Sequence, residues 1–163
     1  MENVSRPNGV ISMRKQPGSA STTNAALTVV SISPIEEDNS SLEAIIGPSR
    51  WRLLKADKLP TALDLLRRHD VSVVLCERDL MPGTWIDILK HIQPTPHPPY
   101  LIVTSKFADE RLWAEALNLG AWDVLAKPFD RSEVIRTVKV AWDLWHHDIE
   151  VAKPMMVMTA AAG

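Results

Sequence analysis

The stretch Val71–Gly83, with the sequence VSVVLCERDLMPG, constrains the fold of this chain more than any other. Its first half has almost no polar residues, which is typical of a strand buried on both faces, as in a parallel sheet. Three charged residues follow at its carboxyl end, Glu77, Arg78 and Asp79, before a turn at 81–83. Because ligands collect at the carboxyl ends of parallel strands, these charged residues are the first candidates for a functional site.

Four other apolar runs alternate with helical patterns along the chain. We expect strands at 26–32, 51–56, 71–76, 100–105 and 122–126, and helices between 34 and 47 and at about 60–69, 84–92, 109–119 and 130–148. Ser33 is expected to provide the hydroxyl cap of the first helix, with the acids at 36–38 in its first turn. This alternation predicts one three-layer α/β domain, with a doubly wound, five-stranded parallel sheet, over residues 26–148. Residues 1–25 are poor in large apolar side chains and are expected to form a flexible tail, and 149–163 a C-terminal tail.

Composition and charge exclude several classes of protein. The chain has 18 Lys and Arg against 20 Asp and Glu, so no basic field favours nucleic acid. It has no signal-peptide pattern at its start and no run of 18 apolar residues, so no membrane segment is expected. Its single cysteine, Cys76, lies in a predicted strand and fits a reducing compartment. These features predict a cytoplasmic protein.

Three short motifs give the chain a family resemblance. The most specific is GAWDVLAKPFD at 120–130, and VTS at 103–105 and MPG at 81–83 accompany it in the expected order. Together they resemble the receiver domain of bacterial two-component response regulators. The resemblance implies a flavodoxin-like sheet with strand order 2-1-3-4-5, and a role in phosphorelay signal transduction.

The resemblance also implies roles for individual residues. In receivers, an aspartate after the third strand accepts phosphate, a hydroxyl after the fourth strand and a lysine after the fifth contact it, and acids after the first strand hold Mg²⁺. By position, Thr104 matches the switch hydroxyl and Lys127 the phosphate-site lysine. An acyl phosphate concentrates negative charge, so a cation and a hydroxyl donor suit its recognition.

The chain departs from the receiver pattern in ways that predict an atypical member. Glu77 falls at the acceptor position, and the first predicted strand ends in uncharged residues, so we expect no metal site. The position of the aromatic switch residue holds Val124. Glu77 is long enough to reach Lys127, which predicts a permanent ion pair at the sheet rim, with no acidic companion from the first strand. The main hypothesis is therefore a stand-alone, phosphorylation-independent receiver-like module without a cofactor.

A second hypothesis keeps phosphorylation. Asp79 stands close before Met81 and Pro82, as the family's acceptor does, and would serve if the strand ran two residues beyond Glu77. Mg²⁺ would then be needed, and one of the acids at 36–38 would have to turn back to bind it, although the helix that they begin should carry them away.

A third hypothesis is an enzyme on the same fold, such as a flavin or nucleotide binder. The chain has only six glycines and no GxGxxG or phosphate loop, which disfavours it. His146 and His147 are adjacent and His91 and His97 flank a proline-rich loop, so none has the spacing of a metal site.

Tryptophan supplies the candidate interaction surface. Trp113, Trp122, Trp142 and Trp145 fall on the last two predicted helices and the last strand, which in receivers form the usual contact face. The expected partners are proteins, such as a histidine kinase or an output protein, and a second copy bound through the last helix. The alternative is that these rings complete the hydrophobic core.

Overall fold

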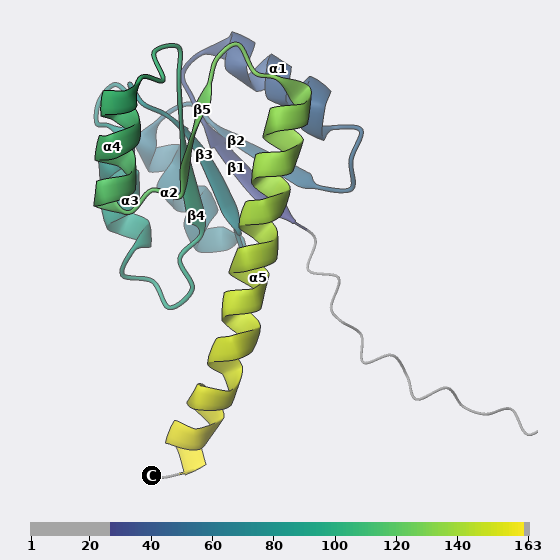
Figure 1. Ribbon diagram of the computed structural model, residues 1–163, viewed down its shortest axis with the longest axis vertical. Helices are drawn as coiled ribbons and strands as arrows, with labels where there is room; N and C mark the ends of the chain where they lie inside the picture. The colour runs from purple at the N-terminus through teal and green to yellow at the C-terminus, as the bar shows by residue number, and fades with distance from the viewer. Residues whose placement is uncertain (1–26, 162–163) are drawn as a thin grey trace, which may run out of the picture.

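The protein alternates strands and helices throughout residues 27–161, the part of the chain that the computed structural model describes (Figure 1). The strands are β1 (Thr28–Ile32), β2 (Arg52–Ala56), β3 (Val73–Glu77), β4 (Tyr100–Ser105) and β5 (Asp123–Ala126). The helices are α1 (Glu36–Ile46), α2 (Leu59–Arg68), α3 (Trp85–Ile92), α4 (Glu110–Leu119) and α5 (Arg131–Ala161). The predicted flexible tail at 1–25 lies outside the described residues.

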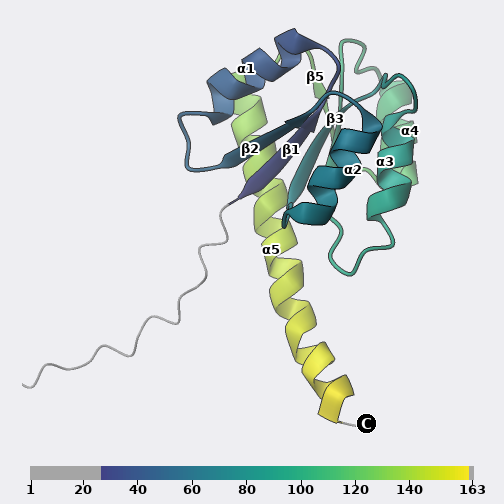
Figure 2. The ribbon, with the colours of Figure 1, turned by 180° about the vertical axis from the view of Figure 1, so that it is seen from behind.

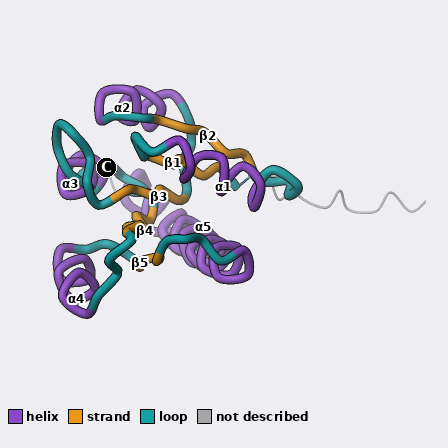
Figure 3. The backbone as a smooth tube through the Cα atoms, turned by 90° about the horizontal axis from the view of Figure 1, so that it is seen from above, coloured by secondary structure: helices purple, strands orange, loops and turns teal. Residues whose placement is uncertain are grey.

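The strands form one parallel sheet in the order β2-β1-β3-β4-β5, between two layers of helices. Seen from above the sheet edge, α1 and α5 lie on one face and α2, α3 and α4 on the other (Figure 3). β3 is the central strand, with β1 and β4 as its neighbours. The predicted fold class, strand order and three-layer architecture are therefore confirmed.

Alternating side chains along each strand divide the interior into two cores. On β3, Val74 and Cys76 pack with the α2, α3 and α4 layer, whereas Val73 and Leu75 pack with the α1 and α5 layer. All four side chains are at most 1% exposed, because helices cover the sheet on both sides. Glu77 continues the second set, so its side chain leaves the strand toward α1 and α5.

Two helix boundaries differ from the sequence-based expectation. Ser33 was expected to provide the hydroxyl cap of the first helix, but the N-cap of α1 is Ile35, and the Ser33 hydroxyl binds Asp38 instead. The last helix was expected to end near Asp148, but α5 continues to Ala161 and projects beyond the sheet (Figure 2). No glycine stands between Asp148 and Ala161, and the residues expected as a tail continue the helix through Pro154. None of the helices within residues 27–161 has the length and apolarity needed to cross a bilayer.

A polar contact fixes α5 at the point where it leaves the sheet. The Tyr100 hydroxyl donates a hydrogen bond to the Asp148 carboxylate, and the Tyr100 ring stacks on Trp122 with centroids 6.1 Å apart. Burial and the Asp148 carboxylate raise the pKa of Tyr100 to about 12. The amino end of β4 is thereby joined to α5 far from the carboxyl ends of the strands.

Because Tyr100 is the only tyrosine in the chain, its ionisation can be followed by tyrosinate absorbance. We expect Tyr100 to remain mostly protonated at about pH 11, where a free tyrosine is mostly ionised. The hydrogen bond stabilises the fold below about pH 10 and is lost as pH rises through the folded pKa of about 12. Asp148→Asn should lower the pKa of Tyr100. Asp143→Asn, at an exposed position on the same helix, should leave it unchanged, and equal shifts in both variants would contradict the assignment.

Candidate functional site

The carboxyl ends of β3, β4 and β5 bring three of the predicted site residues to one rim of the sheet. Glu77 is the last residue of β3 and lies opposite Thr104 of β4 in the strand register. Lys127 directly follows the end of β5. Side chains two residues apart on a strand share a face, which places all three on the side covered by α1 and α5. Each is buried, between 3% and 8% exposed.

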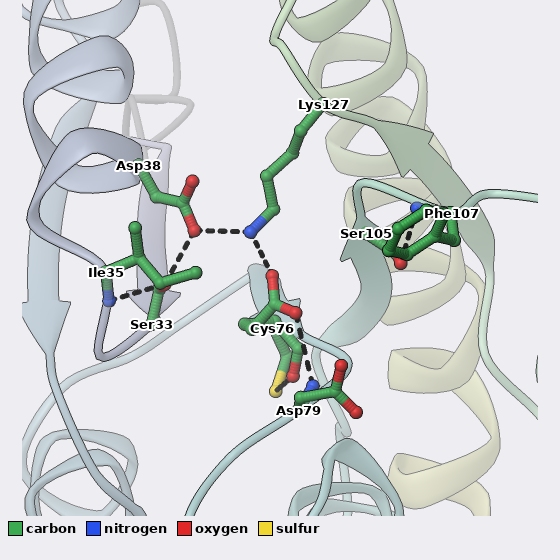
Figure 4. A network of polar contacts seen from close by, with 9 residues as sticks. Ser33, Ile35, Asp38, Cys76, Asp79, Ser105, Phe107 and Lys127 are labelled. Carbon is green, nitrogen blue, oxygen red and sulfur yellow. Dashed lines mark hydrogen bonds and ion pairs between the residues drawn. The ribbon is translucent and has the colours of Figure 1, made fainter.

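The Lys127 ammonium lies between two carboxylates. It forms an ion pair with Glu77 and a second one with Asp38, with 2.5 Å between Lys127 Nζ and Asp38 Oδ2. Figure 4 shows the Lys127 side chain reaching from the end of β5 toward Asp38 on α1. The contact between Glu77 and Lys127 agrees with the sequence-based prediction. The second carboxylate was not expected.

Asp38 corrects the expectation that the first turn of α1 carries its acids away from the rim. This residue is 6% exposed and points at Lys127, because α1 starts beside the carboxyl ends of the strands and covers the face to which Glu77 points. Ser33, at the end of β1, donates a hydrogen bond of 2.7 Å to Asp38 and accepts one from the Ile35 amide. The sequence signal was present, since Ser33 and the acids at 36–38 were recognised, but as features of helix initiation.

Hydrogen bonds compensate part of the cost of burying these charges. Asp38 Oδ2 accepts from both Ser33 and Lys127, and Glu77 Oε1 accepts from the Asp79 amide at 3.2 Å. Glu77 Oε2 contacts Lys127. Two carboxylates against one ammonium leave a formal charge of −1, and donors such as the Asp79 amide and the Ser33 hydroxyl stabilise that excess.

Asp79 does not join this group through its carboxylate. β3 ends at Glu77 rather than two residues later, which removes the condition for Asp79 as the acceptor. Its side chain is exposed and points away from Lys127, and only its backbone amide takes part, by donating to Glu77 (Figure 4).

The VTS motif contributes in two different ways. Thr104 is 3% exposed and faces the Glu77 side of the sheet. Among the described side chains, however, the Lys127 ammonium contacts the carboxylates of Glu77 and Asp38 and not the Thr104 hydroxyl. Ser105 faces the other layer and accepts a hydrogen bond of 3.0 Å from the Phe107 amide, which shapes the loop before α4. Val124 is 2% exposed and packs in the core with α2, α3 and α4.

The other reactive groups near the rim have structural environments. Cys76 is fully buried, donates a 3.4 Å hydrogen bond to the Glu77 carbonyl, and has a raised thiol pKa because of burial and the Glu77 charge. It is therefore held as a thiol. Across the described residues, no group of three or more His, Cys, Asp or Glu side chains is arranged to hold a metal ion.

The four tryptophans do not form one exposed surface, contrary to the sequence-based expectation. Trp145 is 5% exposed and belongs to the buried hydrophobic residues, as the alternative proposed. Trp122 and Trp142 are partly buried against the α1 and α5 core, and Trp142 stacks on His146 with centroids 5.3 Å apart. Trp113 is 39% exposed but belongs to α4, on the opposite face of the sheet from α5 (Figure 3).

Comparison with known sequences gives one family. Residues 37–139, well over half of the chain, match the family model of the response regulator receiver domain. The sensory transduction protein LytR of Staphylococcus saprophyticus is 27% identical over 84 residues, which cover 52% of this chain and 32% of LytR. The response regulator protein PilR of Pseudomonas aeruginosa is 28% identical over 112 residues, covering 68% of this chain and 25% of PilR. The matched segments thus span about a third or less of these relatives.

Solved structures show the same fold. The signal receiver domain of an HD domain-containing protein from Pseudomonas fluorescens superposes with a TM-score of 0.71 and 24% identity, over 77% of this chain and 93% of that domain. The receiver domain of a LuxO repressor homologue from Vibrio parahaemolyticus gives a TM-score of 0.72 at 14% identity, over 77% of this chain and 97% of that domain. With its sheet order and its sequence match, this chain belongs to the response regulator receiver domain family.

Proposed function

We propose that this receiver domain acts by protein contact without being phosphorylated, and that Glu77 stands at the acceptor position. The proposal is supported by one observation: the buried Lys127 ammonium forms ion pairs with the carboxylates of both Glu77 and Asp38. In the family, the lysine after the fifth strand pairs with the incoming phosphate. In this chain the same ammonium already has two anionic partners.

Both oxygens of Glu77 are occupied, which argues against transfer of a phosphoryl group to it. Oε1 accepts the Asp79 amide and Oε2 contacts Lys127. To attack a phosphodonor, a Glu77 oxygen would have to give up its hydrogen-bond donor. The site would then lose a compensating contact while it already carries an excess negative charge. Divalent metal would require Asp38 and Glu77 to release the ammonium that they share, so the lysine and the ion compete for the same carboxylates.

The proposed role is that of a signalling module rather than an enzyme. We expect a protein partner such as a histidine kinase or an output protein, and no requirement for Mg²⁺, flavin or nucleotide. Colourless purified protein without bound nucleotide would agree with this expectation. The cytoplasmic location, inferred from Cys76 and the sequence composition, stays a prediction.

The first test is incubation of the full chain with acetyl phosphate and Mg²⁺, followed by intact-mass measurement. We expect an unmodified mass, because Lys127 and the Asp79 amide engage both oxygens of Glu77. A phosphorylatable receiver treated in parallel verifies the phosphodonor. An increase in mass by one phosphoryl group would contradict the proposal. If this increase disappeared in Asp79→Asn but persisted in Glu77→Gln, the modification would be assigned to Asp79.

The ion-pair geometry predicts an order of stabilities among three variants. Lys127→Met leaves two facing carboxylates buried without a cation, and should lower the free energy of unfolding by about 3–5 kcal/mol. Glu77→Gln and Asp38→Asn should each cost less, because the other carboxylate still neutralises Lys127. Urea denaturation measures all three. Equal losses for Lys127→Met and Glu77→Gln would contradict the shared-lysine arrangement.

We also propose that a second copy binds along α5. Val140, Leu144 and Val151 are 44%, 43% and 57% exposed, and their spacing of four and seven residues places them on one side of the helix. They lie apart from the buried stripe that packs on the sheet, which includes Val134, Val138 and Ala141. Exposed apolar side chains in such a row are typical of helix pairing, so Leu144, rather than one of the four tryptophans, is the expected anchor.

Sedimentation velocity tests the dimer. The wild-type chain should sediment as a dimer, and Leu144→Glu as a monomer, because a buried charge at the centre of an apolar interface is costly. Leu117→Glu is the matched control, since Leu117 is similarly exposed at 47% but lies on α4. A monomeric wild type, or dissociation by both substitutions, would rule out pairing through this face of α5.

A further inference from the structure

A groove lies far from the Lys127 rim, between α2, the end of α3 and the proline-rich loop at 94–99. It has a volume of about 810 Å³. Val71 and Pro99 line it, two residues before β3 and directly before β4, so the groove reaches the amino edge of the sheet, opposite the ends that carry Glu77 and Lys127. Figure 2 shows α2 and α3 side by side on this face. Sites for small molecules measure about 300–1,000 Å³, and this groove falls in that range.

The floor of the groove is apolar. Leu63 and Leu66 of α2 meet Ile92 of α3 and Val71 there, and the last two are only 3% and 5% exposed. The lining runs along α2 from Pro60 in its first turn to His69 at its C-cap, a length of about 14 Å by helix geometry. A rigid apolar body of the size of one or two rings fits such a floor.

The polar lining gathers at one end and is mainly basic. Arg67, His69, His91 and His97 line the end of the groove near the helix C-termini, with Asp70 as the one acidic side chain of the lining. Three of the five histidines of the chain therefore face one groove. Arg67 and Arg68 share a single carboxylate, Asp64, so the end of α2 retains positive charge that offsets its helix dipole.

His91 is held in an orientation that leaves one ring nitrogen for an occupant. Its Nδ1 lies 2.7 Å from the Asp87 carbonyl oxygen. A carbonyl only accepts, so Nδ1 carries the hydrogen, and Nε2 remains as an acceptor in the neutral ring or as a donor to a carboxylate in the imidazolium. Thr95, also in the lining, directs its hydroxyl to the Ile92 carbonyl at 2.7 Å and so fixes the loop beside the helix end.

From the apolar floor and the basic end, we infer that this groove binds a small molecule with an aromatic or aliphatic body and one carboxylate. The body lies along Leu63 and Leu66, and the carboxylate faces Arg67 and the imidazoles. The Arg67 guanidinium, together with the N–H groups that imidazoles can present, favours an anionic head over a cationic one. The inference is independent of the proposed function, because it uses no residue of the Lys127 rim.

The test is a titration of the ¹⁵N-labelled full chain with three probes that share one body: 4-phenylbutanoate, 4-phenylbutanamide and 4-phenylbutylamine. We expect amide shift changes around Arg67, Asp70 and Thr95, with the carboxylate binding about tenfold tighter than the amide, because a charge-assisted hydrogen bond replaces a neutral one. The amine should bind weakest. Absence of shift changes in the groove, or an amine that binds as well as the carboxylate, would overturn the inference.

A matched pair of variants distinguishes the groove from a general charge effect. Arg67 and Arg68 are adjacent, have side chains 77% and 71% exposed, and both pair with Asp64, but only Arg67 lines the groove. Arg67→Gln should weaken the carboxylate probe several-fold without weakening the amide, and Arg68→Gln should leave both unchanged. Equal effects of the two substitutions would show that the groove does not place the carboxylate at Arg67.

Discussion

The buried ammonium of Lys127 is the interaction on which the rim of the sheet depends. It joins three segments that are far apart in the sequence: the end of β5 that carries it, the end of β3 with Glu77, and the first turn of α1 with Asp38. A buried charge without a counter-charge costs several kcal/mol, so these segments are held in register with one another by electrostatics as well as by packing. The Ser33 hydroxyl and the Asp79 amide complete the arrangement by donating to the two carboxylates.

A receiver that responds to phosphate needs a cation whose partner changes. Here the Lys127 ammonium is paired with two carboxylates of the same chain, Glu77 and Asp38. The proposed consequence is that the rim keeps one conformation. Two other side chains of the sheet agree with such a state: Val124, in place of an aromatic ring, is buried on the opposite face, and Thr104 is enclosed beside Glu77. Specificity would then come from surfaces that need no switching, namely the exposed row on α5 and the groove beside α2.

Much of the fold could be predicted from the sequence, because apolar runs and helix-breaking residues report directly on local structure. The five strands, their order through the family resemblance, and the pairing of Glu77 with Lys127 all follow from such patterns. Asp38 was misjudged because its role depends on where α1 lies against the sheet, and the spacing of residues along a helix does not report that placement. Trp145 and Trp113 were grouped for the same reason: α4 and α5 are close in sequence but lie on opposite faces of the sheet. The continuation of α5 beyond Asp148 was missed because a short apolar stretch near the chain end was interpreted as a tail, although no glycine stands between Asp148 and Ala161.

The length of α5 has a mechanical consequence. Its first half is anchored by the core and, at Asp148, by Tyr100, whereas the turns after Asp148 extend past the sheet (Figure 1). At about 1.5 Å per residue, the 31 residues of this helix measure about 46 Å. One end of the helix is fixed to the domain, and the other end projects freely. A slight tilt of α5 against the sheet becomes a much larger sweep at the tip.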